Sequence, residues 1–191
     1  MRYQRRILAM LCVAVLFALS QFAGVVQSQE ADDFAMSEAL YRLVADVRSA
    51  VAEFHDIEAA MEVEYGKFLD CFTHAEIGGM GQHYVNGELA GDRVLDPLQP
   101  EALVYAPTED GELILVALEY LVFADVWDPE DEGLEPPTLF DQEFRLKTNI
   151  PETPPVWTLH IWIGTHNPEG LFADYNPTVF CPADAPIIDM S

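Results

Sequence analysis

The stretch Val156–Asn176, VWTLHIWIGTHNPEGLFADYN, decides the fold that we expect for this chain. Its first half alternates between apolar and other side chains, which is typical of a β-strand. An Asn-Pro turn at Asn167 follows the strand. One face of the strand is apolar, and the other face sets His160 between a threonine and a tryptophan. The two faces are Trp157, Leu159, Ile161 and Ile163 on one side, and Thr158, His160 and Trp162 on the other.

Two further strands precede this one and form a predicted hairpin. Residues 101–106 and 112–124 flank an Asp-Gly pair at Asp110, which is a strong signal for a tight turn. The second of these strands, ELILVALEYLVFA, is apolar at nearly every position. We therefore expect it to lie in the centre of a sheet, covered on both faces. Residues 140–146 also alternate and predict another strand.

The N-terminal part of the mature chain has the periodicity of helices. Apolar residues recur every three or four positions from Phe34 to Phe54, and again from Ile57 to Phe68, where Asp56 can cap the second helix. Helices followed by antiparallel strands predict an α+β fold. We expect two N-terminal helices packed on a mainly antiparallel sheet, in a single domain over residues 29–191.

Residues 1–28 have the pattern of a secretory signal peptide. Three arginines precede a compact apolar run from Ile7 to Leu19, and small residues before Gln29 suit cleavage there. An uncleaved anchor is the alternative, although the run is short for a membrane span. The protein is therefore expected to be secreted or periplasmic, with no membrane attachment after cleavage.

The mature chain is strongly acidic. Removing the three arginines of the signal leaves six basic residues against 33 acidic ones, a formal charge of −27. Binding to nucleic acid or to an anionic membrane needs lysines and arginines that neutralise phosphates, so neither partner is expected. A small molecule or a metal ion remains as a partner, and the pattern does not indicate an oligomeric state.

Two cysteines remain after cleavage, Cys71 and Cys181. Export to an oxidising compartment and the even count favour one disulfide between them. The alternative is a pair of free buried thiols.

Three residues suggest a metal site. Glu119 lies within the apolar strand, where an ionised carboxylate needs a partner. His160 has a similar position on its own strand. His83 lies in a glycine-rich stretch, Gly78–Gly87, which we expect to be a loop that approaches a site closely, with a short strand over residues 82–85 that holds His83. Two histidines and one carboxylate suit Zn, Mn or Fe, with His166 as a possible fourth ligand.

Two other interpretations of the same residues stay open. Glu119 can be satisfied in the core by Arg145, Lys147 or Arg93, with His160 as a satisfied core histidine. Glu119 and His160 can also form an acid/base pair without a metal. No HExxH or CxxC spacing is present to decide between them, so whether the protein is an enzyme stays open.

The Asn-Pro loop after the Val156 strand suggests ligand binding as well. Aromatic and polar groups on a rigid turn suit a small ligand, although a tight loop packed by its own aromatic residues explains the same pattern. An acidic segment, Asp125–Pro137, is either a solvated loop or a weak Ca²⁺ site, because the Glu of an EF-hand is missing. The expected ligand-binding residues are Tyr84, Trp162, Asn167 and Tyr175.

Three stretches resemble an uncharacterised family of secreted bacterial proteins. They are GGMGQHYVN from Gly78, PEALVYAP from Pro100 and LHIWIGTHNPEGLFADYNP from Leu159. The resemblance implies export and a single domain, and it carries no activity or functional residue to this chain.

Overall fold

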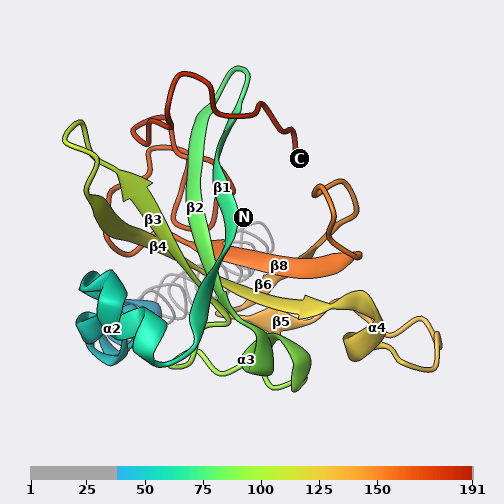
Figure 1. Cartoon of the computed structure of the whole chain (residues 1–191). Coiled ribbons are helices and arrows are strands. Elements are labelled where there is room, and N and C mark those ends of the chain that lie inside the picture. The colour runs from blue at the N-terminus through green and yellow to red at the C-terminus, as the bar shows by residue number, and fades with distance from the viewer. Residues whose placement is uncertain (1–37, 191) are drawn as a thin grey trace, which may run out of the picture. The chain divides into compact units, whose positions relative to one another are not determined.

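The computed structural model describes residues 38–190 (Figure 1). The chain divides into a unit that ends at Leu43 and a unit that begins at Val44. In the described part of the first unit, residues 38–43 are helical and Arg42 pairs with Glu38 one turn away. The predicted signal peptide and the start of the first predicted helix lie outside the described residues.

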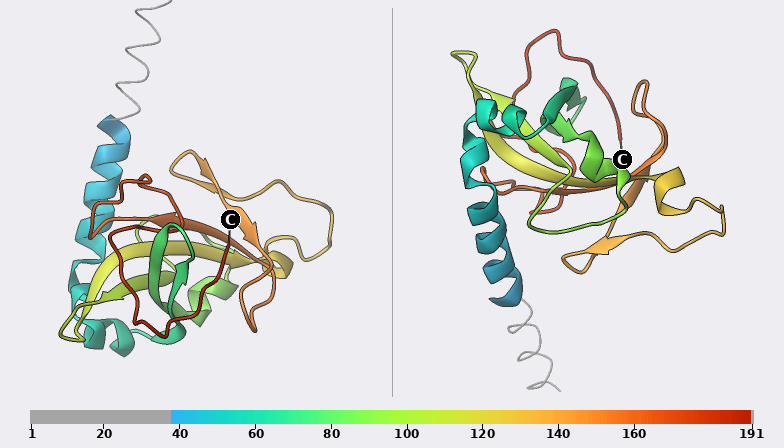
Figure 2. Two further views of the ribbon diagram at one scale, coloured as in Figure 1. Left: turned by 90° about the horizontal axis from the view of Figure 1, so that it is seen from above. Right: turned by 60° about the horizontal axis from the view of Figure 1, so that its bottom comes forward.

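The second unit is built on a curled antiparallel sheet of six strands, in the order β1-β2-β3-β4-β8-β7 (Figures 1 and 2). A separate two-stranded hairpin, β5-β6, lies in the chain between β4 and β7. A sheet with a few helices confirms the α+β class. The strands are β1 (Tyr65–His74), β2 (Gly78–Asn86), β3 (Ala102–Pro107), β4 (Leu113–Phe123), β5 (Thr138–Leu139), β6 (Gln142–Glu143), β7 (Arg145–Lys147) and β8 (Val156–Ile161).

The predicted hairpin and the central position of β4 are confirmed. The main-chain N–H groups of Thr108 and Gly111 close the turn, bonding to the carbonyls of Glu112 and Thr108, respectively. β4 then pairs with β3 on one side and β8 on the other. The predicted strand over residues 140–146 is interrupted, because Phe140 and Asp141 take positive φ values of 55° and 57° and form the turn between β5 and β6.

The predicted pair of N-terminal helices is only partly present. Residues 44–50 are helical and bury Val44 and Val47, and a short 3-10 helix, η1 (Ala52–His55), follows. Asp56 caps α2 (Ile57–Glu62) as expected, because its side chain accepts a 3.0 Å hydrogen bond from the N–H of Glu58.

The prediction that this second helix continues to Phe68 is wrong. α2 has only six residues, Glu64 takes a positive φ of 70°, and β1 begins at Tyr65. The spacing of the apolar residues fits a helix, but pairing with β2 and the hydrogen bond from the Tyr65 hydroxyl to the Pro100 carbonyl, at 2.6 Å, hold this segment in the sheet. The other helices, α3 (Gly87–Gly91) and α4 (Ala124–Trp127), are also short. Within residues 38–190, none of the helices has the length and apolar character needed to span a membrane.

The glycine-rich stretch forms a continuous strand, which confirms the short strand predicted over residues 82–85 and replaces the loop predicted around it. β2 runs through it, and Gly79 exchanges hydrogen bonds with the C-terminal segment: its N–H donates to Val179 and its carbonyl accepts from Asn176. A Cβ on Gly79 would lie 2.6 Å from the Val179 carbonyl oxygen, so only glycine allows this approach. The glycines therefore bring the C-terminal segment against β2 and place His83 within the sheet.

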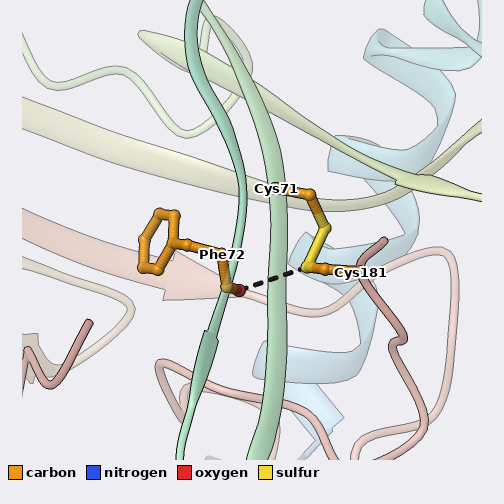
Figure 3. Close-up of a disulfide and its surroundings, with 3 residues drawn as sticks. All are labelled: Cys71, Phe72 and Cys181. Carbon is orange, nitrogen blue, oxygen red and sulfur yellow. Dashed lines mark hydrogen bonds between the residues drawn. A yellow bond between two sulfur atoms is a disulfide. The ribbon is translucent and has the colours of Figure 1, made fainter. Parts of the chain in front are cut away.

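A disulfide between Cys71 and Cys181 ties the C-terminal segment to β1 and confirms the predicted pairing (Figure 3). The Sγ atom of Cys181 also contacts the Phe72 carbonyl oxygen at 3.2 Å. Further along, the main chain of Thr73 bonds to Pro186 and Ile188. The segment after β8 is thus fixed along the edge of the sheet.

Replacing both cysteines with alanine should lower the free energy of unfolding by about 4 kcal/mol, since the disulfide closes a loop with a sequence separation of 110 residues. Denaturant unfolding at neutral pH measures this change. A reducing agent should destabilise the natural protein and leave the double variant unchanged. A loss under about 1 kcal/mol would show that the disulfide is not what holds the C-terminal segment.

Candidate functional site

The sheet register brings His83, Glu119 and His160 together from three strands. Glu119 on β4 lies directly opposite His160 on β8 and, on its other side, opposite Ala102 of β3. His83 on β2 is opposite Val104 of β3. Successive side chains of a strand alternate between faces, so all of these residues share one face of the sheet. The small residues of β3 leave room for His83 and Glu119 to meet across that strand.

These three residues, which we call the His/Glu/His group, are deeply buried and close enough to share an ion. Each offers a ligand atom, and the three atoms lie within 4.8 Å of one another. Nε2 of His83 is 3.5 Å from Oε2 of Glu119. The residues are 1%, 7% and 1% exposed, in chain order.

The imidazole of His160 lacks a hydrogen-bond partner among the described residues, because both of its ring nitrogens are buried without one. The ring of Trp162 lies against His160, and the ring of Phe72 stacks on His83. His83 differs from His160, because the backbone of Gly81 lies close enough to raise its pKa in part. An unsatisfied buried polar atom costs about 1–3 kcal/mol. Two such nitrogens on one ring, beside a buried carboxyl, are therefore unusual for a site with a purely structural role.

Burial makes every member of the group electrically neutral near pH 7. Burial and the neighbouring His160 lower the pKa of His83 to about 3. Burial lowers the pKa of His160 to about 4 and raises the pKa of Glu119 to about 8. The 3.5 Å contact between His83 and Glu119 has the length of an ion pair, but it would need a protonated His83. At neutral pH it instead joins a neutral imidazole to a carboxylic acid.

The basic residues that were the expected partners of Glu119 are engaged elsewhere. Nζ of Lys147 lies 2.8 Å from Oδ2 of Asp174 and also donates to the Met190 carbonyl. Arg145 pairs with the same Asp174 oxygen at 3.0 Å, and Arg93 lies over the ring of Trp127. The charge of Lys147 lowers the pKa of Glu119 in part, but burial and the charge of Asp174 outweigh it.

Asp174 is a functional residue that sequence reasoning missed. Burial would raise the pKa of its carboxyl, but the hydrogen bond and charge of Lys147 and the charge of Arg145 lower it below the usual value. Asp174 therefore stays ionised and acts electrostatically on both His160 and Glu119. Its position in the loop after β8 follows no periodicity, so no signal in the sequence marks it. Thr158 was also missed as a neighbour of Glu119, although its alternation with His160 could have shown it.

A small cavity of about 30 Å³ opens onto His83 and Glu119. We call it the inner pocket. A larger hollow of about 540 Å³ lies between α4 and the region of Pro154, but no member of the His/Glu/His group lines it, so its size does not make it the chemical site. The inner pocket is lined by Phe68, Leu69, His83, Val85, Glu119, Leu121, Phe123, Ile150, Thr153, Val156 and Thr158.

The structure does not bring His166 or Tyr84 to the His/Glu/His group. His166 is exposed, and its main-chain carbonyl accepts a 3.2 Å hydrogen bond from the Asn176 side chain. Tyr84 follows His83 directly on β2 and so faces the other side of the sheet, where it meets Tyr105 edge to face. Neither residue is placed to serve as a ligand or to contact a molecule at Glu119.

The remaining predicted ligand-binding residues hold the Asn-Pro loop together. Nε1 of Trp162 donates to the Ala173 carbonyl, and Nδ2 of Asn167 donates to the Tyr175 carbonyl at 2.9 Å. The Tyr175 hydroxyl donates to the Ile188 carbonyl at 2.5 Å. These bonds support the interpretation of a tight, ordered loop. Of the three, Trp162 alone contacts a member of the His/Glu/His group.

The acidic segment Asp125–Pro137 is ordered by its own main chain. Both carboxylate oxygens of Asp128 accept hydrogen bonds, from the N–H groups of Glu132, Gly133 and Leu134. This arrangement supports the interpretation of a self-capped surface loop over that of a calcium site.

Comparison with protein-family models, with curated proteins and with solved structures found no match to this chain.

The buried group makes the stability of the metal-free protein depend on pH in two directions. Unfolded histidines have a pKa of about 6.5, so the stability contributed by His83 and His160 is present above that pH and is lost as the pH falls toward 4 and 3. Glu119 acts oppositely. Its folded pKa of about 8 exceeds its ordinary value of 4.5, so its contribution is full below pH 4.5 and is lost as the pH rises through 8.

The Glu119→Gln variant should therefore become more stable than the natural protein by an amount that grows between pH 5 and 8. The difference between their free energies of unfolding should grow by about 1 kcal/mol per pH unit, because only the folded natural protein keeps the proton on Glu119 over this range. Denaturant unfolding of chelator-treated protein at four pH values in this range measures it. The exposed Glu112→Gln exchange is the control and should give a curve parallel to that of the natural protein. A parallel curve for Glu119→Gln would mean that Glu119 ionises normally.

Proposed function

We propose that this protein binds one divalent transition-metal ion, Zn, Mn or Fe, through His83, Glu119 and His160. The observation that carries the proposal is the state of His160. Both of its ring nitrogens are buried without a hydrogen-bond partner among the described residues, although its ligand atom lies within 4.8 Å of two other potential ligands. A bound cation would satisfy one of these nitrogens directly.

The geometry of the group supports a metal. Ligand atoms that sit about 2.0–2.1 Å from a tetrahedral zinc lie roughly 3.3 Å apart. The separation of 3.5 Å between His83 Nε2 and Glu119 Oε2 is close to this value. The upper limit of 4.8 Å within the group is larger, so binding requires the side chains to draw together. A set of two histidines and one carboxylate leaves coordination positions open, as in catalytic rather than structural sites.

The protonation states of the group also favour the binding of a cation. Metal ligands must be deprotonated, and both histidines already are at neutral pH. Only Glu119 must release a proton, so the ion replaces one proton in a neutral, buried site. Asp174 stays ionised nearby and opposes the repulsion between the ion and Lys147. Carboxylates around the ligands of a metal typically strengthen its binding.

The compartment that we propose for this chemistry is the periplasm or the exterior of the cell. A disulfide is typical of an oxidising environment, and the charged N-terminal pattern supports export. If the protein is an enzyme, we propose a metal-assisted reaction in which the ion activates a bound water.

The natural protein, purified from the periplasm without chelator, should contain about one equivalent of Zn, Mn or Fe by elemental analysis. The His160→Ala variant should lose it, with at least a hundredfold weaker affinity, because it removes one of three ligands. The His166→Ala variant is the matched control and should keep the metal, since His166 is exposed and lies outside the group. No metal in the natural protein, even after dialysis against each ion, would contradict the proposal.

The affinity should also increase with pH up to about 8, because the ion competes with the proton on Glu119. Titration of the metal-free protein at pH 6, 7 and 8 would show this trend as tighter binding at each step. An affinity that does not change over this range would mean that Glu119 is not a ligand.

A further inference from the structure

We infer that the inner pocket delivers a small uncharged ligand, of about two non-hydrogen atoms, to the ion held by the His/Glu/His group. This inference rests on the proposed metal site and names the class of molecule that the site admits. It is drawn from the size, the lining and the entrance of the pocket.

The size of the pocket limits the ligand. Its volume is about 30 Å³, and one water molecule needs roughly 10–15 Å³ measured in this way. The floor is the face of the sheet that carries Glu119 and Thr158, and the segment containing Ile150 and Thr153 lies across it. Thr153 is fixed there by its hydrogen bonds to the Ile150 and Pro151 carbonyls. One or two water-sized atoms fit beside the ligands, and a sugar, peptide or nucleotide does not.

The lining favours an uncharged molecule. Apart from the ligands, the wall is formed by aliphatic and aromatic side chains and two threonines, of which Thr153 already donates its hydroxyl to Pro151. The nearby cations, Lys147 and Arg145, are paired with Asp174. An anion would therefore lose its hydration and gain only the attraction of the ion itself, because no cationic side chain lines the pocket. The acidic surface, at a formal charge of −27 without the signal, also repels anions.

The pocket borders a larger hollow. This outer hollow has a volume of about 560 Å³ and shares three lining residues with the inner pocket, namely Phe68, Leu69 and Thr153. The acidic residues Asp70 and Glu152 also line the outer hollow. Phe68 is 46% exposed and belongs to both spaces. We therefore place the entrance of the inner pocket at these shared residues, where the acidic lining of the outer hollow favours neutral molecules over anions.

Neutral diatomic molecules that coordinate a metal suit the size, the lining and the entrance of the pocket. Nitric oxide is such a molecule and serves as the probe. The chelator-treated protein is loaded anaerobically with Fe(II), and the bound iron is counted first. Nitric oxide should then give the electron paramagnetic resonance signal of a ferrous-nitrosyl complex, at nearly one per iron. Excess azide, which is charged and has three atoms, should leave that signal unchanged.

A variant that fills the pocket distinguishes access of nitric oxide through the pocket from binding of the metal alone. Val85→Phe adds a ring to the wall without removing a ligand, so it should keep one iron and lose the nitrosyl signal at least tenfold. Leu69→Trp fills the pocket from its entrance and should have the same effect. This second variant tests the inference if Val85→Phe does not fold. Ile114→Phe, at an exposed site on β4, is the control and should keep both iron and signal.

The possible failures are distinguishable. Iron binding with no nitrosyl signal, displacement of the signal by azide, or a full signal in a folded pocket-filling variant would overturn this inference and leave the metal site standing. Failure of the natural protein to bind iron, Zn or Mn would overturn the proposed function and this inference together.

Discussion

The pairing of β4 with β8 is the constraint on which the rest of this structure depends, because it sets Glu119 opposite His160 inside the protein. A carboxyl group and an imidazole are both strongly hydrated, so a central sheet position is costly for each. The cost forces both groups into their neutral forms, and it leaves ring nitrogens without partners among the described residues. The stability of the fold must therefore come from elsewhere in the sheet and from the segment that covers it.

That covering segment is the part of the chain after β8. It forms main-chain bonds with Gly79 and Thr73, it is joined to β1 by the disulfide, and it carries Asp174 toward the buried group. In the loop-entropy view, the disulfide contributes an amount similar to the cost of two or three unsatisfied polar atoms. The site and the disulfide are thus linked: a polar group can stay buried in the sheet because the segment that covers it is tied down by the disulfide.

The sequence allowed much of the sheet to be predicted, because its signals are local. The Asp-Gly turn, the continuous apolar run of β4 and the alternation of β8 each specify one strand or one turn. The pairing partners of Glu119 and the continuation of β1 through Tyr65 depend on residues far away in the chain, and there the helical spacing up to Phe68 was misleading. His83 was predicted for the site, on a short strand within a glycine-rich loop, and it lies there on the longer strand β2. His166, although close to His160 in the chain, is exposed and outside the group.

The acidic surface and the buried site interact with cations in different ways. The acidic surface raises the local concentration of cations near the protein, but it holds no cation tightly, because exposed carboxylates are well hydrated. The His/Glu/His group has the opposite properties: it is buried, neutral and low in dielectric, so an ion that enters would gain three ligands and release one proton to solvent. Weak attraction outside and proton-coupled capture inside would make metal loading sensitive to pH while the ion is shielded from competing anions. With the proposed ion bound, the mainly apolar wall of the inner pocket would extend this selection to the molecules that reach the ion, because it would admit them by size and by lack of charge.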